Sequence, residues 1–484
     1  MKKLTDILKN TPVRELCGDT AAAIGGLVYD SRAVKPGDCF FAVPGTQSDG
    51  HDYIPIAVEK GAAAIVCERM PADAAEGVAY VLVGDSAGAM ADMAAAFYDY
   101  PSRELKLVGI TGTNGKTTTA TLLYDLVRAM GYKAGLISTV VYKIDGREVE
   151  ATHTTPDSIR LNAMMREMAD AGCAYCFMEC SSHAIVQERT RGLDFAGGIF
   201  SNITHDHLDY HKTFAEYIRA KKLFFDGLPK GAFALTNADD RNGRVMVQNT
   251  AAAVSAYSLR AMADFRCKIV EMHLDGMLLR IDGQELWVGL LGRFNAYNLL
   301  AVYGAAALLG LDRGEVLRVL SMLHAVSGRF EKIRAANGTT AIVDYAHTPD
   351  ALENVIQTIE EIRTPEQQLI VVCGCGGDRD RTKRPEMAAI AVKYATMAVF
   401  TSDNPRHESP EAILDDMVAG LEPGARYLRI ADRAEAIRTA VMLSRPGDII
   451  LVAGKGHETY QIVGDVKHPF DDREEIKKRF ALLN

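Results

Sequence analysis

The feature that most constrains the fold of this chain is a glycine-rich turn within residues 110–118. An apolar run at residues 105–110 predicts a strand before the turn, and apolar residues at helical spacing predict a helix after it, as far as Gly131. A strand, a tight glycine turn and a helix N-terminus form a phosphate-binding loop, because backbone N–H groups converge on the anion and the helix dipole adds positive charge.

This loop is a shorter variant of the common phosphate loop, with the pattern Gly-x-x-Gly-Lys-Thr. Ile110 stands five residues before Gly115, where a glycine is usual. Lys116 suits the β- and γ-phosphates of ATP, and Thr117 suits a Mg²⁺ ion bound to them. An incidental glycine turn is the alternative, but the coincidence of strand, lysine, threonine and helix favours a nucleotide site. The residues predicted to hold ATP here are Gly112, Thr113, Asn114, Gly115, Lys116, Thr117 and Thr118.

Composition limits the class of protein. A chain of 484 residues is long enough for about three domains. The net charge of −9 argues against nucleic acid as the main partner, because phosphate neutralisation requires a basic surface. No apolar run reaches the ~18 residues of a membrane span, and the N-terminus is too polar for a secretory signal. Nine cysteines, an odd number, indicate reduced thiols in the cytoplasm rather than a disulfide framework or a zinc site.

The middle of the chain repeats one plan, in which an apolar strand is followed by polar residues. Strands that alternate with helices predict a mostly parallel sheet, and ligands of such sheets lie beyond the carboxyl ends of the strands. Glu179, Ser181 and His207 all follow predicted strands. A carboxylate directly after a buried strand is costly unless it is paired, so metal binding by Glu179 is favoured over a cap or a salt bridge.

Two further features concern the possible metal site. His205, His207 and His211 form the densest histidine group of the chain, with aspartates between them, which favours a site over isolated structural histidines. Lys221 belongs to the apolar stripe of a helix predicted at residues 213–226. Periodicity alone favours a Lys221 side chain that extends along the apolar surface to solvent.

From about residue 332 the strand-and-loop plan returns. Four apolar strands each end in a glycine- or charge-rich loop, and Arg379, Arg406 and Lys455 would place cationic donors for carboxylates or phosphates at that edge. Before residue 100, a polar loop at residues 45–51 fits a nucleotide or sugar site and plain turn chemistry equally well. We therefore predict an α/β protein with a small N-terminal domain (1–100), a central P-loop-type domain with a mostly parallel sheet (101–331) and a Rossmann-like C-terminal domain (332–484).

At this point the sequence resembles a known family along almost its whole length: the ATP-dependent Mur ligases of peptidoglycan synthesis. The matching stretches are residues 30–32, 112–118, 154–156, 178–183, 206–211, 344–349, 377–379, 403–406 and 454–458. The resemblance implies three domains that bind a UDP-sugar, ATP and an incoming amino acid. It also implies that Lys221 is the family's carbamylated lysine, whose carbamate is a carboxylate-like metal ligand, in place of the solvent-directed side chain above.

The resemblance assigns further residues to each ligand. It places Ser31 at the uridine nucleotide, and Glu179, His207 and Lys221 with Thr117 at Mg²⁺. Lys116, Glu179, His207 and Lys221 would be the catalytic group. The remaining assignments are Thr154, Thr155, Ser181, Gln187 and Arg189 for the muramoyl-peptide, and Asn298, Arg329 and Asp344 for ATP.

The implied reaction is the ATP-dependent addition of the third residue to UDP-N-acetylmuramoyl-L-alanyl-D-glutamate through an acyl phosphate. Asp403-Asn-Pro-Arg406 resembles the form found in members that add meso-diaminopimelate, whose second carboxylate a guanidinium can bind through two hydrogen bonds. The implied pocket comprises Arg379, Asp403, Asn404, Pro405, Arg406, Gly454 and Glu458. A lysine-adding ligase, a folylpolyglutamate or cyanophycin synthetase and a P-loop ATPase switch are the alternatives.

Overall fold

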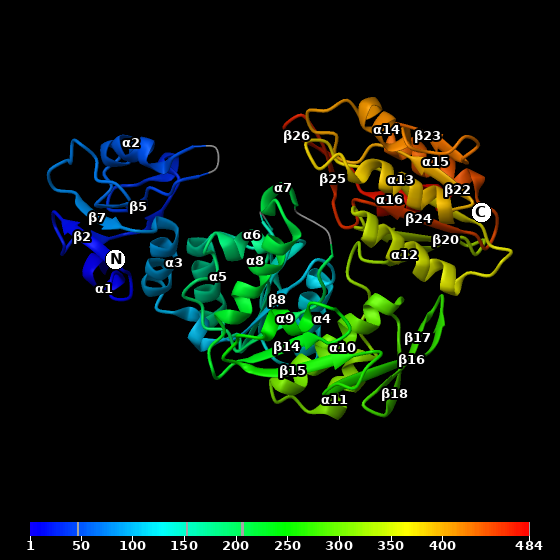
Figure 1. Cartoon of the computed structure of the whole chain (residues 1–484), viewed down its shortest axis with the longest axis horizontal. Coiled ribbons are helices and arrows are strands. Elements are labelled where there is room, and N and C mark those ends of the chain that lie inside the picture. Colours follow the sequence, from blue (N-terminus) through cyan, green and yellow to red (C-terminus); the bar gives the residue numbers. More distant parts are fainter. Residues whose placement is uncertain (46–47, 152, 205–207, 484) are drawn as a thin grey trace.

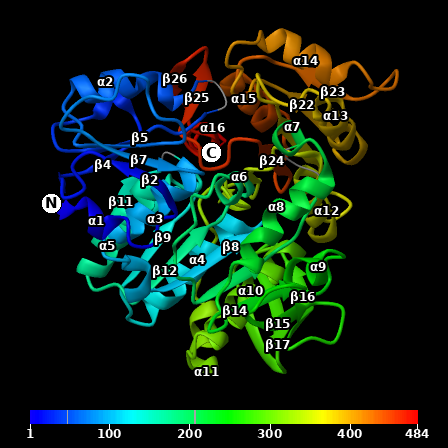
Figure 2. The same cartoon turned by 60° about the vertical axis from the view of Figure 1, so that its left-hand side comes forward.

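The structure is a computed structural model that describes residues 1–45, 48–151, 153–204 and 208–483. It contains three α/β domains, each built on its own main sheet. In Figure 1 the N-terminal domain (blue) and the C-terminal domain (yellow to red) lie on opposite sides, and the central domain (cyan to green) lies between and below them. The turned view in Figure 2 shows both outer domains above the central sheet. The predicted fold class is therefore confirmed.

The N-terminal domain has a five-stranded sheet in the order β2-β7-β6-β5-β4, in which only β2 is antiparallel. Alternate strand residues face two apolar layers, one with helices α1 and α3 and one with helix α2. A small pair, β1 with β3, lies beside this sheet. The bounds are β1 Lys2–Lys3, α1 Leu4–Ile7, β2 Val13–Cys17, β3 Ala23–Ile24, β4 Leu27–Val28, β5 Cys39–Phe41, α2 Ile54–Glu59, β6 Ala64–Cys67, β7 Ala79–Val83 and α3 Ser86–Phe97.

The central sheet has the order β11-β10-β9-β12-β8-β13-β14-β15-β16-β17-β18. Its strands from β9 to β16 are parallel, as predicted, and helices α4, α10 and α11 cover one face while α5, α8 and α9 cover the other. The strands are β8 Lys106–Thr111, β9 Ala134–Ile137, β10 Val141–Ile144, β11 Arg147–Glu150, β12 Tyr175–Glu179, β13 Gly197–Phe200, β14 Phe233–Asn237, β15 Ala253–Ser258, β16 Phe265–His273, β17 Gly276–Ile281 and β18 Gln284–Val288. The helices are α4 Lys116–Ala129, α5 Ser158–Asp170, α6 Ser182–Val186, α7 Leu208–His211, α8 Phe214–Asp226, α9 Gly243–Val247, α10 Arg293–Leu308 and α11 Arg313–Leu320.

Both edges of the central sheet are antiparallel, which the sequence analysis did not predict. Strands β10 and β11 are joined by Asp145-Gly146, and β17 and β18 by Asp282-Gly283. All four of these residues have positive φ, as a two-residue hairpin turn requires. The Asp-Gly pairs are the sequence signal for these two hairpins.

The C-terminal domain has a six-stranded sheet in the order β19-β20-β24-β21-β22-β23, parallel except for β19. Helices α12, α13 and α14 pack on one face, in an apolar cluster continuous with that of the central domain, and α15 and α16 pack on the other. The strands are β19 Glu331–Arg334, β20 Thr340–Asp344, β21 Leu369–Cys373, β22 Met397–Phe400, β23 Tyr427–Arg429, β24 Ile449–Ala453 and the hairpin β25 Tyr460–Val463 with β26 Val466–Pro469. The helices are α12 Pro349–Ile362, α13 Lys383–Tyr394, α14 Pro410–Val418, α15 Arg433–Leu443 and α16 Asp472–Phe480.

A buried ion pair joins the last two helices. Arg433 on α15 donates two hydrogen bonds to the Asp472 carboxylate on α16, at 2.7 and 2.8 Å, and neither side chain is exposed. We expect Asp472→Ala to lower the free energy of unfolding of the C-terminal domain by about 3–5 kcal/mol, because it leaves a buried guanidinium without its counter-charge. Glu474→Ala, which removes an exposed pair with Lys477 on the same helix, should change it by less than ~1 kcal/mol. Equal thermal midpoints for the two variants would contradict this.

Candidate active site

The phosphate loop has the strand–turn–helix geometry that the sequence predicts. Strand β8 ends at Thr111 and helix α4 begins at Lys116. Gly112 and Gly115 both have positive φ, and a Cβ atom at these positions would lie 2.0 Å from Ser201 Oγ and 2.5 Å from Asn298 Oδ1, respectively. Only glycine fits at both positions, because a side chain would meet strained backbone and occupied space.

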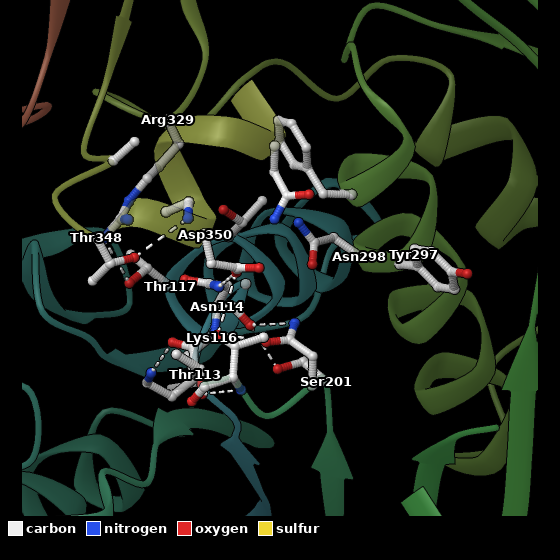
Figure 3. Close-up of a pocket in the computed structure, with 18 of the residues that line it drawn as sticks. Thr113, Asn114, Lys116, Thr117, Ser201, Tyr297, Asn298, Arg329, Thr348 and Asp350 are labelled. Carbon is white, nitrogen blue, oxygen red and sulfur yellow. Dashed lines mark hydrogen bonds between the residues drawn. The ribbon is translucent and has the colours of Figure 1, made fainter. Parts of the chain in front are cut away.

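The loop is stabilised from the end of the neighbouring strand β13. The Asn114 N–H donates to Asn202 Oδ1 at 3.0 Å, and Ser201 Oγ donates to the Asn114 carbonyl at 2.6 Å. Lys116 Nζ donates to the carbonyls of Gly112 and Thr113, both at 2.8 Å, so its ammonium lies over the loop. Figure 3 shows Asn114, Lys116 and Ser201 close together in one cavity.

The C-terminal domain contacts the phosphate loop directly. Asn114 Nδ2 donates to Asp350 Oδ2 at 3.1 Å, and Thr204 Oγ1 donates to the same oxygen at 3.3 Å. Arg329, in the segment that leads into the C-terminal domain, donates from Nη2 to Thr117 Oγ1 at 3.2 Å, and its guanidinium lies over the ring of Tyr345 in that domain. Figure 3 shows Asp350 and Arg329 close to the phosphate loop. Burial raises the pKa of the Asp350 carboxyl, and these hydrogen bonds oppose the shift.

The loop opens into a cavity of about 500 Å³ that includes the other residues predicted for ATP, namely Asn298, Arg329 and Asp344. This volume is typical of a small-molecule site. The Asp344 carboxylate accepts hydrogen bonds from the N–H groups of Phe330 and Ala346 at 2.7 and 2.8 Å, and burial raises its pKa. Three residues that were not predicted from the sequence, Arg260, Arg293 and Tyr297, also line this cavity. They come from the central domain beyond strand β15, where no motif marked them.

Glu179 lies at the end of strand β12 in the same cavity as Thr117 and Lys221. Its side chain is fully buried, and it accepts hydrogen bonds from the Thr139 N–H and Oγ1 at 2.7 and 3.2 Å. A carboxylate and a hydroxyl are the oxygen ligands that Mg²⁺ prefers, and Mg²⁺ usually adds waters and phosphate oxygens to one or two protein ligands. Among the described residues no three His, Cys, Asp or Glu side chains cluster as a metal site. The donors present therefore fit a magnesium ion held jointly by protein and nucleotide.

The structure separates the remaining candidates for the metal site. The Lys221 side chain is 1% exposed and donates to the Gly112 carbonyl at 2.8 Å, so the periodicity-based expectation of a solvent-directed lysine is wrong. His205 and His207 lie outside the described residues. His211 is buried, its Nε2 lies 2.8 Å from Ser182 Oγ, and it lines neither of the two cavities described here. His211 therefore packs within the domain, and the predicted site at the histidine group stays a prediction for His205 and His207.

The residues assigned to the muramoyl-peptide form one hydrogen-bonded group. Thr155 Oγ1 donates to the Glu179 carbonyl at 2.7 Å, and Arg189 donates to the Thr155 carbonyl and to Gln187 Oε1, both at 2.6 Å. Ser181 Oγ accepts from the Ala184 N–H as the N-cap of α6, and Thr154 Oγ1 accepts from Thr139 Oγ1 at 3.1 Å. This group adjoins Glu179, because Thr155 donates to the Glu179 carbonyl and Thr139 contacts both Thr154 and the Glu179 carboxylate.

Ser31 lies in the N-terminal domain, in the turn after strand β4, and does not line the cavities between the other two domains. Burial raises the pKa of the hydroxyl of the nearby Tyr29, and the charge of Asp157 adds to this rise while that of Arg189 opposes it. For the polar loop at residues 45–51, Thr46 and Gln47 lie outside the described residues, and Asp49 binds His51 and Arg69.

A second cavity, of about 1210 Å³, contains the residues predicted for the incoming amino acid, except Pro405. Arg406 has positive φ, and its Nη1 donates to the Gly377 carbonyl at 2.8 Å. The residues from the predicted set that line it are Arg379, Asp403, Asn404, Arg406, Gly454 and Glu458. Lys455 does not line it: its side chain is buried behind the pocket, so the expectation that it offers its ammonium to a ligand is not met.

The two cavities are parts of one cleft between the central and C-terminal domains. They share lining residues from both domains, including Thr154, Thr204, Tyr345, His347 and Asp350. The phosphate loop thus faces the same space as the guanidinium of Arg406. Such a site can bring a nucleotide, a carboxylate and an amine together.

Comparison with known proteins identifies the family of this chain. Three family models match it: the Mur ligase family catalytic domain at residues 23–98, the Mur ligase middle domain at 110–306 and the Mur ligase glutamate ligase domain at 328–456. The chain belongs to the Mur ligase family. Similar curated proteins are the UDP-N-acetylmuramoyl-L-alanyl-D-glutamate–2,6-diaminopimelate ligases of Phocaeicola vulgatus and Bacteroides fragilis, each 55% identical over 99% of both chains.

Solved Mur ligase structures share the fold of this chain. A structure of a UDP-N-acetylmuramoyl-L-alanyl-D-glutamate–2,6-diaminopimelate ligase is 32% identical, with a TM-score of 0.69 over 95% of each chain. A MurF ligase from Thermotoga maritima in complex with ADP has a TM-score of 0.64 over 94% of this chain and 96% of its own, at 18% identity. The three-domain arrangement is therefore common to this Mur ligase and to distant members.

Gly115→Ala tests the phosphate loop. The added Cβ would lie against Asn298 Oδ1 at a positive φ, so we expect kcat/KM for ATP to fall by at least tenfold, from a steric and backbone cost of about 1–2 kcal/mol or more. Gly131→Ala is the matched control: this glycine also has positive φ, at the other end of α4, but a Cβ there meets nothing within 4 Å. ADP release at varied ATP concentration measures both. Equal effects would show that backbone strain alone, and not loop geometry, limits activity.

Proposed function

We propose that this chain adds diaminopimelate to the D-glutamate carboxylate of UDP-N-acetylmuramoyl-L-alanyl-D-glutamate, with conversion of ATP to ADP and phosphate, in peptidoglycan synthesis. The observation that carries the proposal is the shared cleft, in which a phosphate loop faces a pocket that Arg379 and Arg406 line. It is supported by relatives of that name that are 54–55% identical over 99% of this chain. Membership of the Mur ligase family makes the chain an ATP-dependent amide ligase.

The proposed chemistry has two steps. The D-glutamate carboxylate attacks the γ-phosphorus of ATP, which gives an acyl phosphate and ADP. The amine of diaminopimelate then attacks the acyl carbon, the C–O bond to phosphate breaks, and the amine loses a proton. Lys116, the N-terminus of α4 and the loop N–H groups balance the charge of the transferred phosphoryl group.

Thr117 and Glu179 would hold Mg²⁺, together with His207 and a carbamylated Lys221 in the assignment carried over from the family. When bound, the ion would neutralise negative charge on the phosphates. The burial of Lys221 beside the Gly112 carbonyl, in the cavity that Thr117 and Glu179 also line, supports this assignment. A carbamate there would replace a buried cation with an anionic oxygen ligand.

We propose that each of the three domains positions one substrate, and that the domain boundaries lie near residues 100 and 331. Ser31 would contact the uridine nucleotide, and the group from Thr154 to Arg189 would hold the peptide with its carboxylate toward Glu179.

In the described residues, no helix is both long and apolar enough to cross a bilayer. We expect the reaction to take place in the cytoplasm, where ATP is available, with small molecules as its only required partners.

In the proposed amino-acid site, Arg406 and Arg379 bind the second carboxylate of diaminopimelate, and Glu458 binds the neighbouring amine. The meso isomer is proposed because Asp403-Asn-Pro-Arg406 resembles the form found in members that add meso-diaminopimelate. L-Lysine lacks the second carboxylate and would leave the two arginines without their anionic partner, so we expect it to be a poor substrate.

The proposed function is tested by measuring ADP release with UDP-muramoyl-dipeptide, ATP and Mg²⁺, with and without meso-diaminopimelate. We expect release to depend on both the dipeptide and diaminopimelate, and lysine to support at most a few per cent of the rate. Equal turnover with lysine would overturn the amino-acid assignment. ADP release without any amino acid would instead indicate an ATPase switch.

Arg406→Ala tests the carboxylate contact. We expect kcat/KM for diaminopimelate to fall by roughly tenfold to a hundredfold, the loss associated with a hydrogen-bonded charged group, while KM for ATP stays unchanged. Arg438→Ala removes an arginine whose exposed partner is Glu435 on α15, and it should leave both constants unchanged. If Arg406→Ala also raised KM for ATP by roughly tenfold to a hundredfold, Arg406 would have no specific role in the amino-acid pocket.

A further inference from the structure

Lys455 is a charged residue that is buried beside the amino-acid pocket without lining it. It follows strand β24, its side chain is 0% exposed, and its Nζ lies 3.1 Å from Asn404 Oδ1 and 2.9 Å from Glu458 Oε2. A lysine is rarely buried completely unless its charge is paired. Here both partners belong to the pocket, so Lys455 can reach a ligand only through them.

The two partners are also bound to each other. Asn404 Nδ2 donates to Glu458 Oε2 at 2.9 Å, and the Ile462 N–H donates to Asn404 Oδ1 at 2.9 Å. Glu458 is 13% exposed and lines the pocket, as Asn404 does. Both hydrogen bonds to Glu458 use Oε2, and Oε1 accepts none from the part of the chain that the structure describes. The network therefore fixes one oxygen of Glu458 and leaves the other for a ligand.

The charge of Lys455 changes what Glu458 can attract. A carboxylate alone would favour any ammonium, whether it stands alone or next to a carboxylate. With Lys455 at 2.9 Å, much of the Glu458 charge is already compensated, and the pocket that Arg406 also lines becomes less negative. A ligand end that carries both an ammonium and a carboxylate is then favoured over a bare ammonium, because only the first supplies negative charge.

We propose that Lys455 is a positioning residue for amino-acid selection: by holding Asn404 and Glu458 and compensating the Glu458 charge, it favours an amino-acid group at the far end of the substrate over a bare amine. The inference rests on the proposed function and deepens it. A purely structural lysine would stabilise the loop without any influence on the choice between the two substrates.

Lys455→Met tests this directly, because methionine keeps the unbranched apolar stem of lysine as far as Cε and removes the charged ammonium. The readout is the ratio of dissociation constants for lysine and meso-diaminopimelate, measured calorimetrically with a non-hydrolysable ATP analogue and UDP-muramoyl-dipeptide present. We expect diaminopimelate to bind about tenfold more weakly and the preference over lysine to shrink by about tenfold, the effect of one charge-assisted hydrogen bond. Equal weakening of both ligands would overturn the proposal.

Two further variants test whether the effect of Lys455 on ligand choice acts through Glu458. Lys477→Met removes a lysine with the same spacing and distance to its glutamate, 2.9 Å to Glu474, on the exposed face of α16, and should leave the ratio unchanged. In a Glu458→Gln background, Lys455→Met should no longer change the ratio, since its effect acts through the Glu458 charge. A persistent tenfold change there would overturn the proposal. The ratio of dissociation constants is measured without turnover, so it tests the role of Lys455 independently of the reaction. Absence of turnover in the unaltered enzyme would contradict only the proposed function.

Discussion

The contact between the phosphate loop and the C-terminal domain is the interaction on which the rest of the site depends. Asp350 of the C-terminal domain accepts a hydrogen bond from Asn114 of the loop, and Arg329, in the segment that leads into that domain, donates one to Thr117. The nucleotide cavity and the amino-acid pocket share Asp350 and other lining residues, so they form one space. Holding reactants in attack geometry can supply about 7–11 kcal/mol of the barrier reduction of a ligation, which makes the relative placement of the two domains as important as any single side chain.

The architecture explains why the functional residues gather there. The loop and Ser201 follow strands β8 and β13, and Glu179 and Asp344 end strands β12 and β20, so each comes from the carboxyl end of a parallel strand. Two such sheet edges face each other across the cleft. The buried polar side chains at these strand ends are hydrogen-bonded, because an unpaired polar group is costly in low-dielectric surroundings. These hydrogen bonds fix the orientation of the side chains before a ligand binds.

Local sequence patterns predicted the features that depend on neighbours in the chain. The phosphate loop, the parallel strands and the polar residues at their ends follow from periodicity and turn chemistry. Periodicity failed for Lys221, because it gives the face of the helix but not what covers that face, and only the family resemblance indicated a special role. The antiparallel edges were missed although Asp145-Gly146 and Asp282-Gly283 signal them. The contact of Asn114 with Asp350 and the inward direction of Lys455 depend on tertiary packing, which no local pattern carries.

The most direct test of a shared cleft follows oxygen from one substrate to the product of the other. If both oxygens of the D-glutamate carboxylate of UDP-muramoyl-dipeptide carry ¹⁸O, an acyl phosphate formed in the cleft must transfer one of them to phosphate when the amine attacks. Mass spectrometry of the released phosphate should then show one ¹⁸O atom per amide bond formed. Amide product accompanied by unlabelled phosphate would contradict direct phosphoryl transfer between the two halves of the cleft.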